Sequence, residues 1–291
     1  MKRGSNITAT ILCHNSFPIL ERTLAAVQRQ TLQPARVIAV DNASGDGTSA
    51  YLRDHEWVDL LEMPQNVGVG AGHNQAISQA LKDEPCRFVW LLEHDVVPEP
   101  TCLENLISAY SDLTAKGWHV GAVSPRLERD LSEEAANRRP GSRPVPAGRL
   151  TFNAVLFPRE TLESLGPLRS DFFVGLEDTE YAERMERAGL MNVSVPEALA
   201  FHPNKGNKRF GIRPSVLRSY YSTRNSVYLE VQLHRDILAV PLYLARALAG
   251  ILRTLIQEDG KISRIAARST ATFDGITGRM GRREYWFMQD N

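Results

Sequence analysis

ITATILCHNSFPILERTLAAVQRQTLQPARVIAVDNASGDGT, residues 7–48, decides the fold class, because it alternates between two kinds of hydrophobic pattern. Residues 7–13 and 35–41 are nearly continuous apolar runs, which is typical of strands buried on both faces of a sheet. Between them, residues 18–30 place apolar side chains at the spacing of an amphipathic helix. A strand, a helix and a second strand in this order predict an α/β fold with a parallel sheet.

The same alternation continues along the chain and predicts a mostly parallel sheet flanked by helices. We expect further strands at 58–63, 87–93, 119–125, 151–158 and 192–202. We expect helices at 48–55, 70–81, 101–116, from 159, at 178–188 and after 213. In such folds ligands bind at the carboxyl ends of the strands, so the polar residues there are the first candidates for a site.

Composition excludes several classes of protein. The chain has 291 residues, with 34 Lys and Arg balanced by 34 Asp and Glu, so a general affinity for nucleic acid is not expected. Its three cysteines form no CxxC pair, which fits a reducing compartment. The first ten residues lack the apolar core of a signal peptide, and no apolar run approaches the ~18 residues of a membrane span. We therefore expect a cytoplasmic protein.

Two carboxylates follow the strand at 87–93, in the segment Glu93-His94-Asp95. Residues two apart on an extended backbone point to the same side, so Glu93 and Asp95 are expected to share one ligand. Carboxylate oxygens suit Mg²⁺ or Mn²⁺, which keep coordination positions open for substrate phosphates.

A glycine cluster, NVGVGAGHN at 66–74, follows the third expected strand. It lacks the GxGxxG spacing of a dinucleotide site and the GK[ST] ending of a P-loop. Two interpretations stay open: the backbone approaches a ligand closely, or it packs closely against another segment of the chain.

An acidic helix start follows the aromatic segment Asp171-Phe172-Phe173 and contains Glu177 and Asp178. Negative charge at a helix N-terminus complements the helix dipole, which explains most such sequences. A carboxylate held against apolar surroundings can instead have a raised pKa and act as a general base.

Taken together, these motifs resemble the inverting nucleotide-sugar glycosyltransferases of family 2, which have the GT-A fold, a Rossmann-like α/β sheet. The resemblance covers residues 7 to about 228. Its motifs, in chain order, are ATILCHN, VDNASGDGT, NVGVGAGHNQAI, LLEHD, FFVGLEDTEYAERMERAG, AFH and YYSTRN. The chain looks most like bacterial rhamnosyl- and galactofuranosyltransferases.

The resemblance implies a role for each matching residue. The nucleotide sugar would be bound by His14, Asn15, Asp41, Asn66, Asn74, Glu93 and Arg224. Asp95 and His202 would hold Mg²⁺ or Mn²⁺, and Asp178 would take the proton of the acceptor hydroxyl, with Glu177 as its competitor.

The expected domains are a GT-A catalytic domain at 1–228 and a helical, basic extension at 229–291. Within the first, 1–125 is the nucleotide-binding half, 126–149 a mobile loop and 150–228 the acceptor half. Residues 236–256 form an amphipathic pattern with a basic stripe of Arg235, Arg246 and Arg253. The segment 236–283 is either a membrane-surface element, on the inner face of the cell membrane, or a helix packed on the core or on a partner.

The expected function is metal-assisted, inverting transfer of a sugar from a UDP- or dTDP-sugar to a hydroxyl of a lipid-linked or polysaccharide acceptor. One alternative is a sugar-1-phosphate nucleotidyltransferase, which would need a glycine-rich basic loop where residues 14–18 read HisAsnSerPhePro. Another is an inactive nucleotide-sugar-binding module on the same scaffold. The sequence does not indicate an oligomeric state.

Overall fold

A computed structural model describes residues 2–128, 144–147, 150–202, 215–257 and 261–288. Contacts divide the chain into two compact units. The first unit comprises residues 1–67, 71–168 and 181–205, and the second comprises 68–70, 169–180 and 206–291. Most of the loop expected at 126–149 lies outside the described residues.

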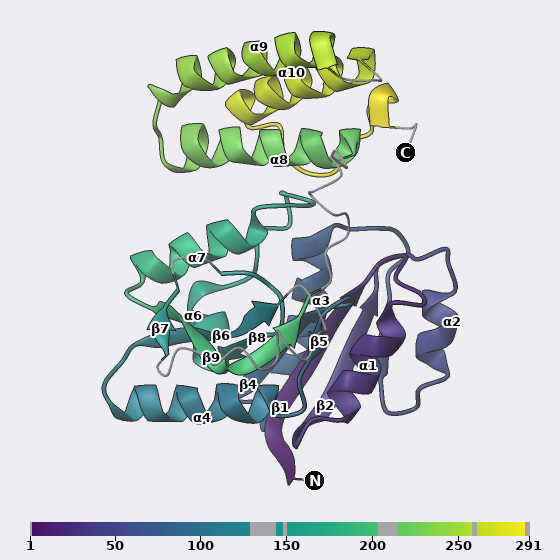
Figure 1. Cartoon of the computed structure of the whole chain (residues 1–291), viewed down its shortest axis with the longest axis vertical. Helices are drawn as coiled ribbons and strands as arrows, with labels where there is room; N and C mark the ends of the chain where they lie inside the picture. Colours follow the sequence, from purple (N-terminus) through teal and green to yellow (C-terminus); the bar gives the residue numbers. More distant parts are fainter. Residues whose placement is uncertain (1, 129–143, 148–149, 203–214, 258–260, 289–291) are drawn as a thin grey trace. The chain divides into compact units, whose positions relative to one another are not determined.

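The first unit is built on one mixed sheet (Figure 1). Its main path runs β3 (Asp59–Glu62), β2 (Leu32–Asp41), β1 (Lys2–Cys13), β4 (Phe88–Glu93), β8 (Val155–Pro158), β6 (Val120–Glu128), β9 (Met191–Phe201) and β5 (Val97–Pro98), and β7 (Val145–Pro146) pairs with β9. The pairs β1–β2, β2–β3, β1–β4 and β6–β9 are parallel, whereas β8, β5 and β7 run antiparallel to their neighbours. The expected mostly parallel sheet is confirmed, and the two-residue strands β5 and β7 are additions too short for a hydrophobic pattern to show.

Helices in the first unit follow the strands as the sequence predicts. They are α1 (Leu20–Gln28), α2 (Thr48–Arg53), α3 (Val69–Leu81), α4 (Cys102–Ala115), α6 (Arg159–Leu165) and α7 (Glu177–Arg187), of which α3 and α7 each begin with residues of the second unit.

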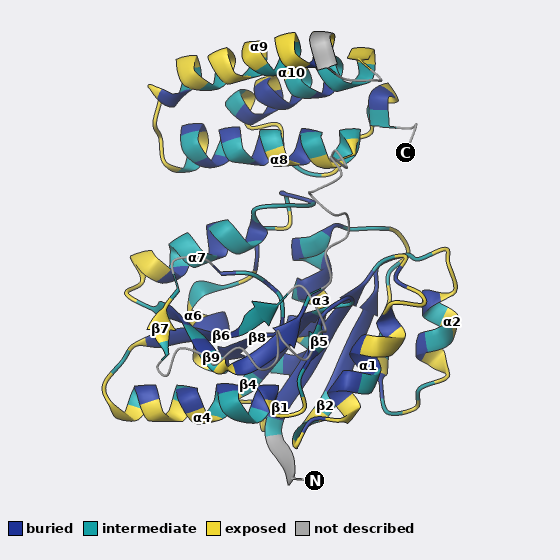
Figure 2. Ribbon diagram, viewed as in Figure 1, coloured by how far each residue is buried: buried dark blue, intermediate teal, exposed yellow. Residues whose placement is uncertain are grey.

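Both faces of the sheet are buried, as Figure 2 shows along β1, β2 and β4. Alternate residues of β1 face opposite ways: Ile11 belongs to a core shared with α1 and α4, whereas Leu12 lies where α3 passes at Gly72. Burial on both faces is the physical reason that these strands read as continuous apolar runs in the sequence.

The second unit consists of helices around an aromatic core. Its elements are α8 (Val216–Tyr228), the π-helical turn η2 (Leu229–Leu233), α9 (Ala239–Gln257), α10 (Lys261–Thr277) and the 3₁₀ turn η3 (Trp286–Met288). Tyr220, Tyr221 and Phe287 are buried together with Phe173 from the segment before α7. This unit therefore begins earlier than the boundary expected at residue 229, because α8 packs with α10. None of the helices in the described ranges is long and apolar enough to cross a membrane.

Candidate functional site

The loops after β1 and β2 are tied together by side-chain hydrogen bonds at the carboxyl ends of the two strands. His14 Nδ1 lies 2.9 Å from the carbonyl oxygen of Asn42, and Asn15 Oδ1 accepts a 2.8 Å bond from the Gly45 N–H. The Asn15 N–H donates to the Ser44 hydroxyl. Asn15 adopts a φ of 48°, a left-handed conformation that asparagine tolerates better than most residues. His14 and Asn15 are therefore held next to the end of the second strand, and their contact with a nucleotide stays a prediction.

Asp41 is the last residue of β2, and its side chain is almost buried, with 3% exposed. Its carboxylate accepts a long hydrogen bond from the Ser44 N–H at 3.3 Å. The neighbouring Asn42 connects this strand end to the loop after β3: its Nδ2 donates to Asn66 Oδ1 at 3.2 Å, and its Oδ1 accepts from the Val67 N–H at 2.9 Å. Asn42 was not predicted as a site residue, although its position directly after Asp41, at the carboxyl end of a strand, could have indicated it.

Asp46 fixes the shape of this loop pair. Its carboxylate accepts hydrogen bonds from the hydroxyl and N–H of Thr48, at the start of α2, and from the N–H of Phe17. Burial opposes the charged form, but these hydrogen bonds outweigh it and hold the pKa of Asp46 below its ordinary value. The carboxylate therefore stays ionised at neutral pH and holds the two loops together.

Glu93 ends β4, and its carboxylate lies 3.2 Å from Nε2 of His73, which is completely buried in α3. The other ring nitrogen of His73, Nδ1, is buried with no hydrogen-bond partner in the described parts of the chain. A proton on Nε2 therefore makes the more favourable tautomer, because it is donated to Glu93.

Asp95, 5% exposed, lies 3.4 Å from the imidazole Nε2 of His202. The register of the sheet explains this proximity across more than 100 residues of sequence. β5 pairs antiparallel with β9, with Val97 opposite Phe201, so the residues just before β5 and just after β9 meet. The two predicted metal ligands thus lie side by side.

The backbone from Glu93 to Asp95 is not extended as expected. The strand ends at Glu93, and a turn closed by a hydrogen bond from the Val96 N–H to the Glu93 carbonyl follows it. Alternation of side chains holds only on extended backbone, so the geometric reason for a shared ligand was wrong. The shared ligand itself stays a prediction. Glu93 faces His73, and Asp95 faces His202.

In the second unit, the aromatic turn, residues 171–176, leads directly into α7, which begins at Glu177. Glu177 is 4% exposed, whereas Asp178 is only partly buried. One oxygen of Asp178 accepts a 2.7 Å hydrogen bond from the Thr179 N–H. The two adjacent carboxylates therefore differ in access, and Asp178 is the one that a ligand can reach more easily.

The glycine cluster packs closely against this turn. A Cβ on Gly68, whose φ is 89°, would lie 2.4 Å from the carbonyl oxygen of Phe173, and one on Gly70 would lie 2.2 Å from that of Arg169. The N–H of Val69 donates to the same Phe173 carbonyl at 2.7 Å. These contacts support the second interpretation of the cluster, in which its backbone packs closely against another segment of the chain.

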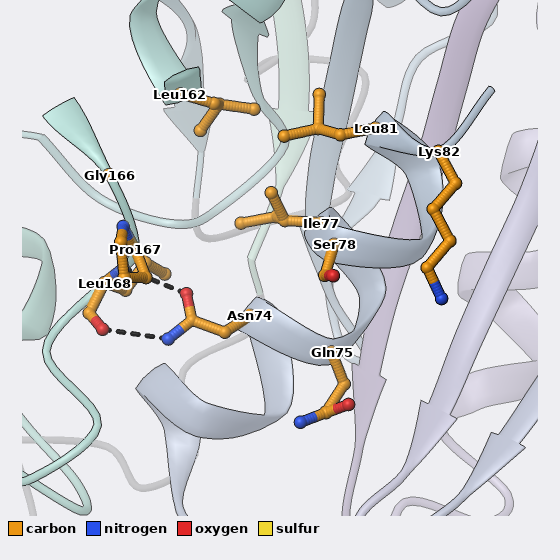
Figure 3. Close-up of a pocket in the computed structure, with 10 residues that line it drawn as sticks. All are labelled: Asn74, Gln75, Ile77, Ser78, Leu81, Lys82, Leu162, Gly166, Pro167 and Leu168. Carbon is orange, nitrogen blue, oxygen red and sulfur yellow. Dashed lines mark hydrogen bonds between the residues drawn. The ribbon is translucent and has the colours of Figure 1, made fainter. Parts of the chain in front are cut away.

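Asn74 and Arg224 are held by backbone groups. Asn74 donates to the carbonyl of Leu168 at 2.8 Å and accepts from its N–H at 2.9 Å, at the wall of a cavity of about 460 Å³ between α3 and the end of α6 (Figure 3). Arg224 is completely buried in α8 and donates to carbonyl oxygens of its own unit. Contact of Asn74 with a nucleotide stays a prediction, whereas the complete burial of Arg224 and its bonds to backbone favour a structural role over nucleotide contact.

The mixed α/β sheet is shared with solved glycosyltransferases of the GT-A fold, which is the fold class of this chain. Residues 8–153 match the family model described as glycosyl transferase family 2, and the chain belongs to this family. The protein is therefore a glycosyltransferase enzyme, and its curated relatives are rhamnosyltransferases.

Three similar proteins illustrate the match. An N-acetylglucosaminyl-diphospho-decaprenol L-rhamnosyltransferase of Mycobacterium tuberculosis is 27% identical over 64% of this chain and 72% of its own. The dTDP-rhamnosyl transferase RfbF of Shigella flexneri is 23% identical over 97% of this chain and 99% of its own. The mannosyltransferase PcManGT of Pyrobaculum calidifontis, solved with GDP-Man and Mn²⁺, superposes with a TM-score of 0.58 at 19% identity, covering 94% of this chain and 88% of that one.

Proposed function

We propose that the protein transfers a sugar, with inversion and with the help of a divalent metal, from a UDP- or dTDP-sugar to a hydroxyl of a lipid-linked or polysaccharide acceptor. The observation that carries the proposal is the pair Asp95 and His202, 3.4 Å apart beside the carboxyl end of β4 in a family 2 chain. Rhamnose is the first sugar to test, because both curated relatives are named for its transfer and one name specifies dTDP.

The residues after β1, β2 and β3 would bind the nucleotide, and Glu93 would lie near its ribose and the sugar. A buried carboxylate at Asp41 supports a uracil or thymine base, because it can accept the imide N–H that adenine and cytosine do not offer. His14, Asn15 and Asn66 would complete this side of the site, and the bonds that join these loops would preorganise it.

Asp95 and His202 are suited to hold a divalent cation. In the described ranges no group of three or more acidic, histidine or cysteine side chains is arranged to enclose a metal. Two protein ligands would instead leave positions for diphosphate oxygens and water. A carboxylate together with an imidazole fits Mn²⁺ better than Mg²⁺, which prefers oxygen ligands throughout. When bound, the cation would supply counter-charge for the departing diphosphate.

Asp178 would act as the general base on the acceptor side. It would take the proton of the acceptor hydroxyl while that oxygen forms a bond to the anomeric carbon. The bond from the anomeric carbon to the diphosphate oxygen breaks, and its electron pair leaves with the nucleoside diphosphate. Attack from the face opposite the leaving group inverts the anomeric configuration.

The exposed face of α9 supports contact with an anionic membrane, where a lipid-linked acceptor would be found. Much of α9 is exposed (Figure 2). Large apolar side chains on this face and just before it are exposed, up to 82% at Leu238; they are Leu238, Leu242, Leu244, Leu248, Leu252 and Leu255. The segment 237–257 contains no acidic residue. Arg246 and Arg253 are exposed and, at 100° per residue, lie together along one edge of the apolar face of the helix. This combination favours a helix lying in the membrane surface.

Thermal-shift and calorimetric titration with UDP, dTDP, ADP and GDP, each with and without Mn²⁺, test the nucleotide and metal assignments. We expect uridine or thymidine diphosphate to raise Tm most and Mn²⁺ to increase that shift, because ligands stabilise the state they bind. Asp41→Ala should lose the shift while keeping the melting temperature of the free protein. Equal stabilisation by ADP would contradict the assignment of Asp41.

A further inference from the structure

The aromatic turn that leads into α7 has an unusual backbone. Phe173, Gly175 and Leu176 have φ values of 64°, 90° and 70°. The left-handed conformation is unfavourable for residues with a Cβ, such as Phe173 and Leu176, and persists only where the surroundings fix it. Groups elsewhere in the second unit must therefore hold this turn, and helix α8 supplies them.

Asn225, completely buried in α8, binds the turn through its side-chain amide. Its Nδ2 lies 3.1 Å from the carbonyl oxygen of Phe172, 3.2 Å from that of Val174 and 2.7 Å from that of Gly175. A single amide nitrogen thus bonds three carbonyls of the four-residue segment 172–175. Its Oδ1 faces the other way and accepts from Nε and Nη2 of Arg224 at 3.0 and 2.8 Å.

Arg224 extends this arrangement. Its Nη2 donates to the carbonyls of Phe172 at 2.7 Å and Asp171 at 3.2 Å, and its Nη1 donates to the carbonyl of Gly281 at 2.6 Å. The N–H of Gly281 donates in turn to the carbonyl of Asp171. The guanidinium carbon lies 4.7 Å from the centre of the Tyr221 ring.

The charge of Arg224 is compensated inside the unit. Asp274, 1% exposed, accepts hydrogen bonds from the hydroxyls of Tyr220 and Tyr285, and the Tyr220 ring lies 5.7 Å from the guanidinium carbon. Burial lowers the pKa of Arg224, but a guanidinium keeps its proton in proteins. The donors of this buried cation bond the carbonyls of Asp171 and Phe172 in the turn, the carbonyl of Gly281 and the side chain of Asn225. We call Arg224 and Asn225 together the clamp.

We infer that Arg224 and Asn225 are positioning residues that hold the aromatic turn so that α7 begins at Glu177 with Asp178 correctly placed. The inference rests on the proposed role of Asp178 as general base. Neither residue would touch substrate, because both are completely buried. Their effect would reach the reaction through the backbone of residues 171–176, where a small displacement is costly for catalysis.

Two conservative variants test the clamp. Asn225→Asp keeps the size of the side chain but replaces the donating nitrogen with an oxygen that repels the three carbonyls. Arg224→Lys keeps the charge but cannot donate to both sides at once. Tyr285→Phe is the matched control, because it removes a partly buried hydrogen bond of the same unit that does not contact the turn.

Three quantities are measured on each purified full-length variant: hydrogen–deuterium exchange of residues 169–180, donor Kd by calorimetry, and kcat for transfer. We expect both clamp variants to speed exchange in this segment and to lower kcat about 100-fold, with donor Kd within about twofold of the parental value. Tyr285→Phe should leave exchange in the segment and kcat unchanged. Parental exchange in the segment and parental kcat in Arg224→Lys and Asn225→Asp would overturn the inference.

The readouts separate this inference from the proposed function. If the parental protein transfers no sugar, or if Asp178→Asn retains full activity, the proposed function or its base fails, while exchange still reports whether the clamp holds the turn. Should Asn225→Asp fail to fold, Arg224→Lys gives the same measurements. A loss of kcat in Tyr285→Phe as large as in the clamp variants would show general destabilisation and would also overturn the inference.

Discussion

The strand ends of the first unit and the aromatic turn of the second hold their functional side chains by different means. In the first, Asp41 and Glu93 are the last residues of strands whose ladders fix the backbone. In the second, the backbone before Asp178 is held in place by buried side chains of α8. Substitutions at the nucleotide-binding strand ends of the first unit, such as Asp41, should therefore change donor affinity. Substitutions around the turn should change turnover, as should loss of the proposed metal ligand Asp95.

The largest effect is expected at the end of the turn. Asp178→Asn keeps the shape of the side chain but removes its ability to take a proton, so kcat should fall ~10²–10⁴-fold. Steady-state transfer assays measure this loss, and Glu177→Gln is the matched control, because its buried side chain should be dispensable for the proton transfer. A dead Glu177→Gln beside a fully active Asp178→Asn would assign the base to the other carboxylate.

Asp95→Asn should lower turnover by ~10²–10³, since the departing diphosphate loses stabilisation of its charge. EDTA should abolish activity of the parental protein, and added Mn²⁺ should restore it. The control is Asp112→Asn, which changes an exposed carboxylate of α4. Full activity of the parental protein in EDTA would show that transfer does not depend on a divalent metal.

Gly68→Ala tests how closely the glycine cluster contacts the turn. The new methyl group would meet the backbone of Phe173, and we expect a loss of ~1–3 kcal/mol in the free energy of unfolding together with reduced kcat. Gly117→Ala is the control, because its φ of 82° is similar but nothing lies within 4 Å of its Cβ. If chemical denaturation gives the two variants the same free energy of unfolding, the close contact between Gly68 and Phe173 does not contribute to stability.

The smallest effect concerns the apolar face of α9. Replacing both Leu248 and Leu252 with Glu should weaken binding to anionic vesicles about tenfold in sedimentation assays, because two apolar contacts are lost and like charges repel. Val145→Glu, at an exposed apolar residue of β7, should have no effect. Indifference of the parental protein to anionic vesicles at low salt would favour a packing or dimer surface.

The sheet was predictable because its strands are buried on both faces and separated by amphipathic helices, so hydrophobicity alone marks the elements. The pairing of Asp95 with His202 followed from the order of the family motifs. The turn between Glu93 and Asp95 was not predicted, because where a strand stops depends on the turn after it rather than on side-chain pattern.

The acidic helix start located the turn before α7 in the sequence, but no sequence feature indicated which residues hold the backbone of that turn. Asn225 bonds carbonyl oxygens, which every residue has, so no sequence pattern at 172–175 identifies it as their partner. The glycines at 68 and 70 left the same uncertainty, since close packing against a ligand and against backbone require the same residue type. Contacts to backbone are determined by the tertiary fold.

The separation of donor binding from proton transfer is the central claim, and calorimetric titration of Asp178→Asn with a dTDP- or UDP-sugar and Mn²⁺ tests it most directly. Asp178→Asn should bind the donor with a Kd within about twofold of the parental value, although it has almost no turnover. Asp41→Ala, titrated alongside, should bind the donor about 10- to 100-fold more weakly, as expected for a lost charged hydrogen bond. Donor affinity lost in Asp178→Asn and kept in Asp41→Ala would contradict the account.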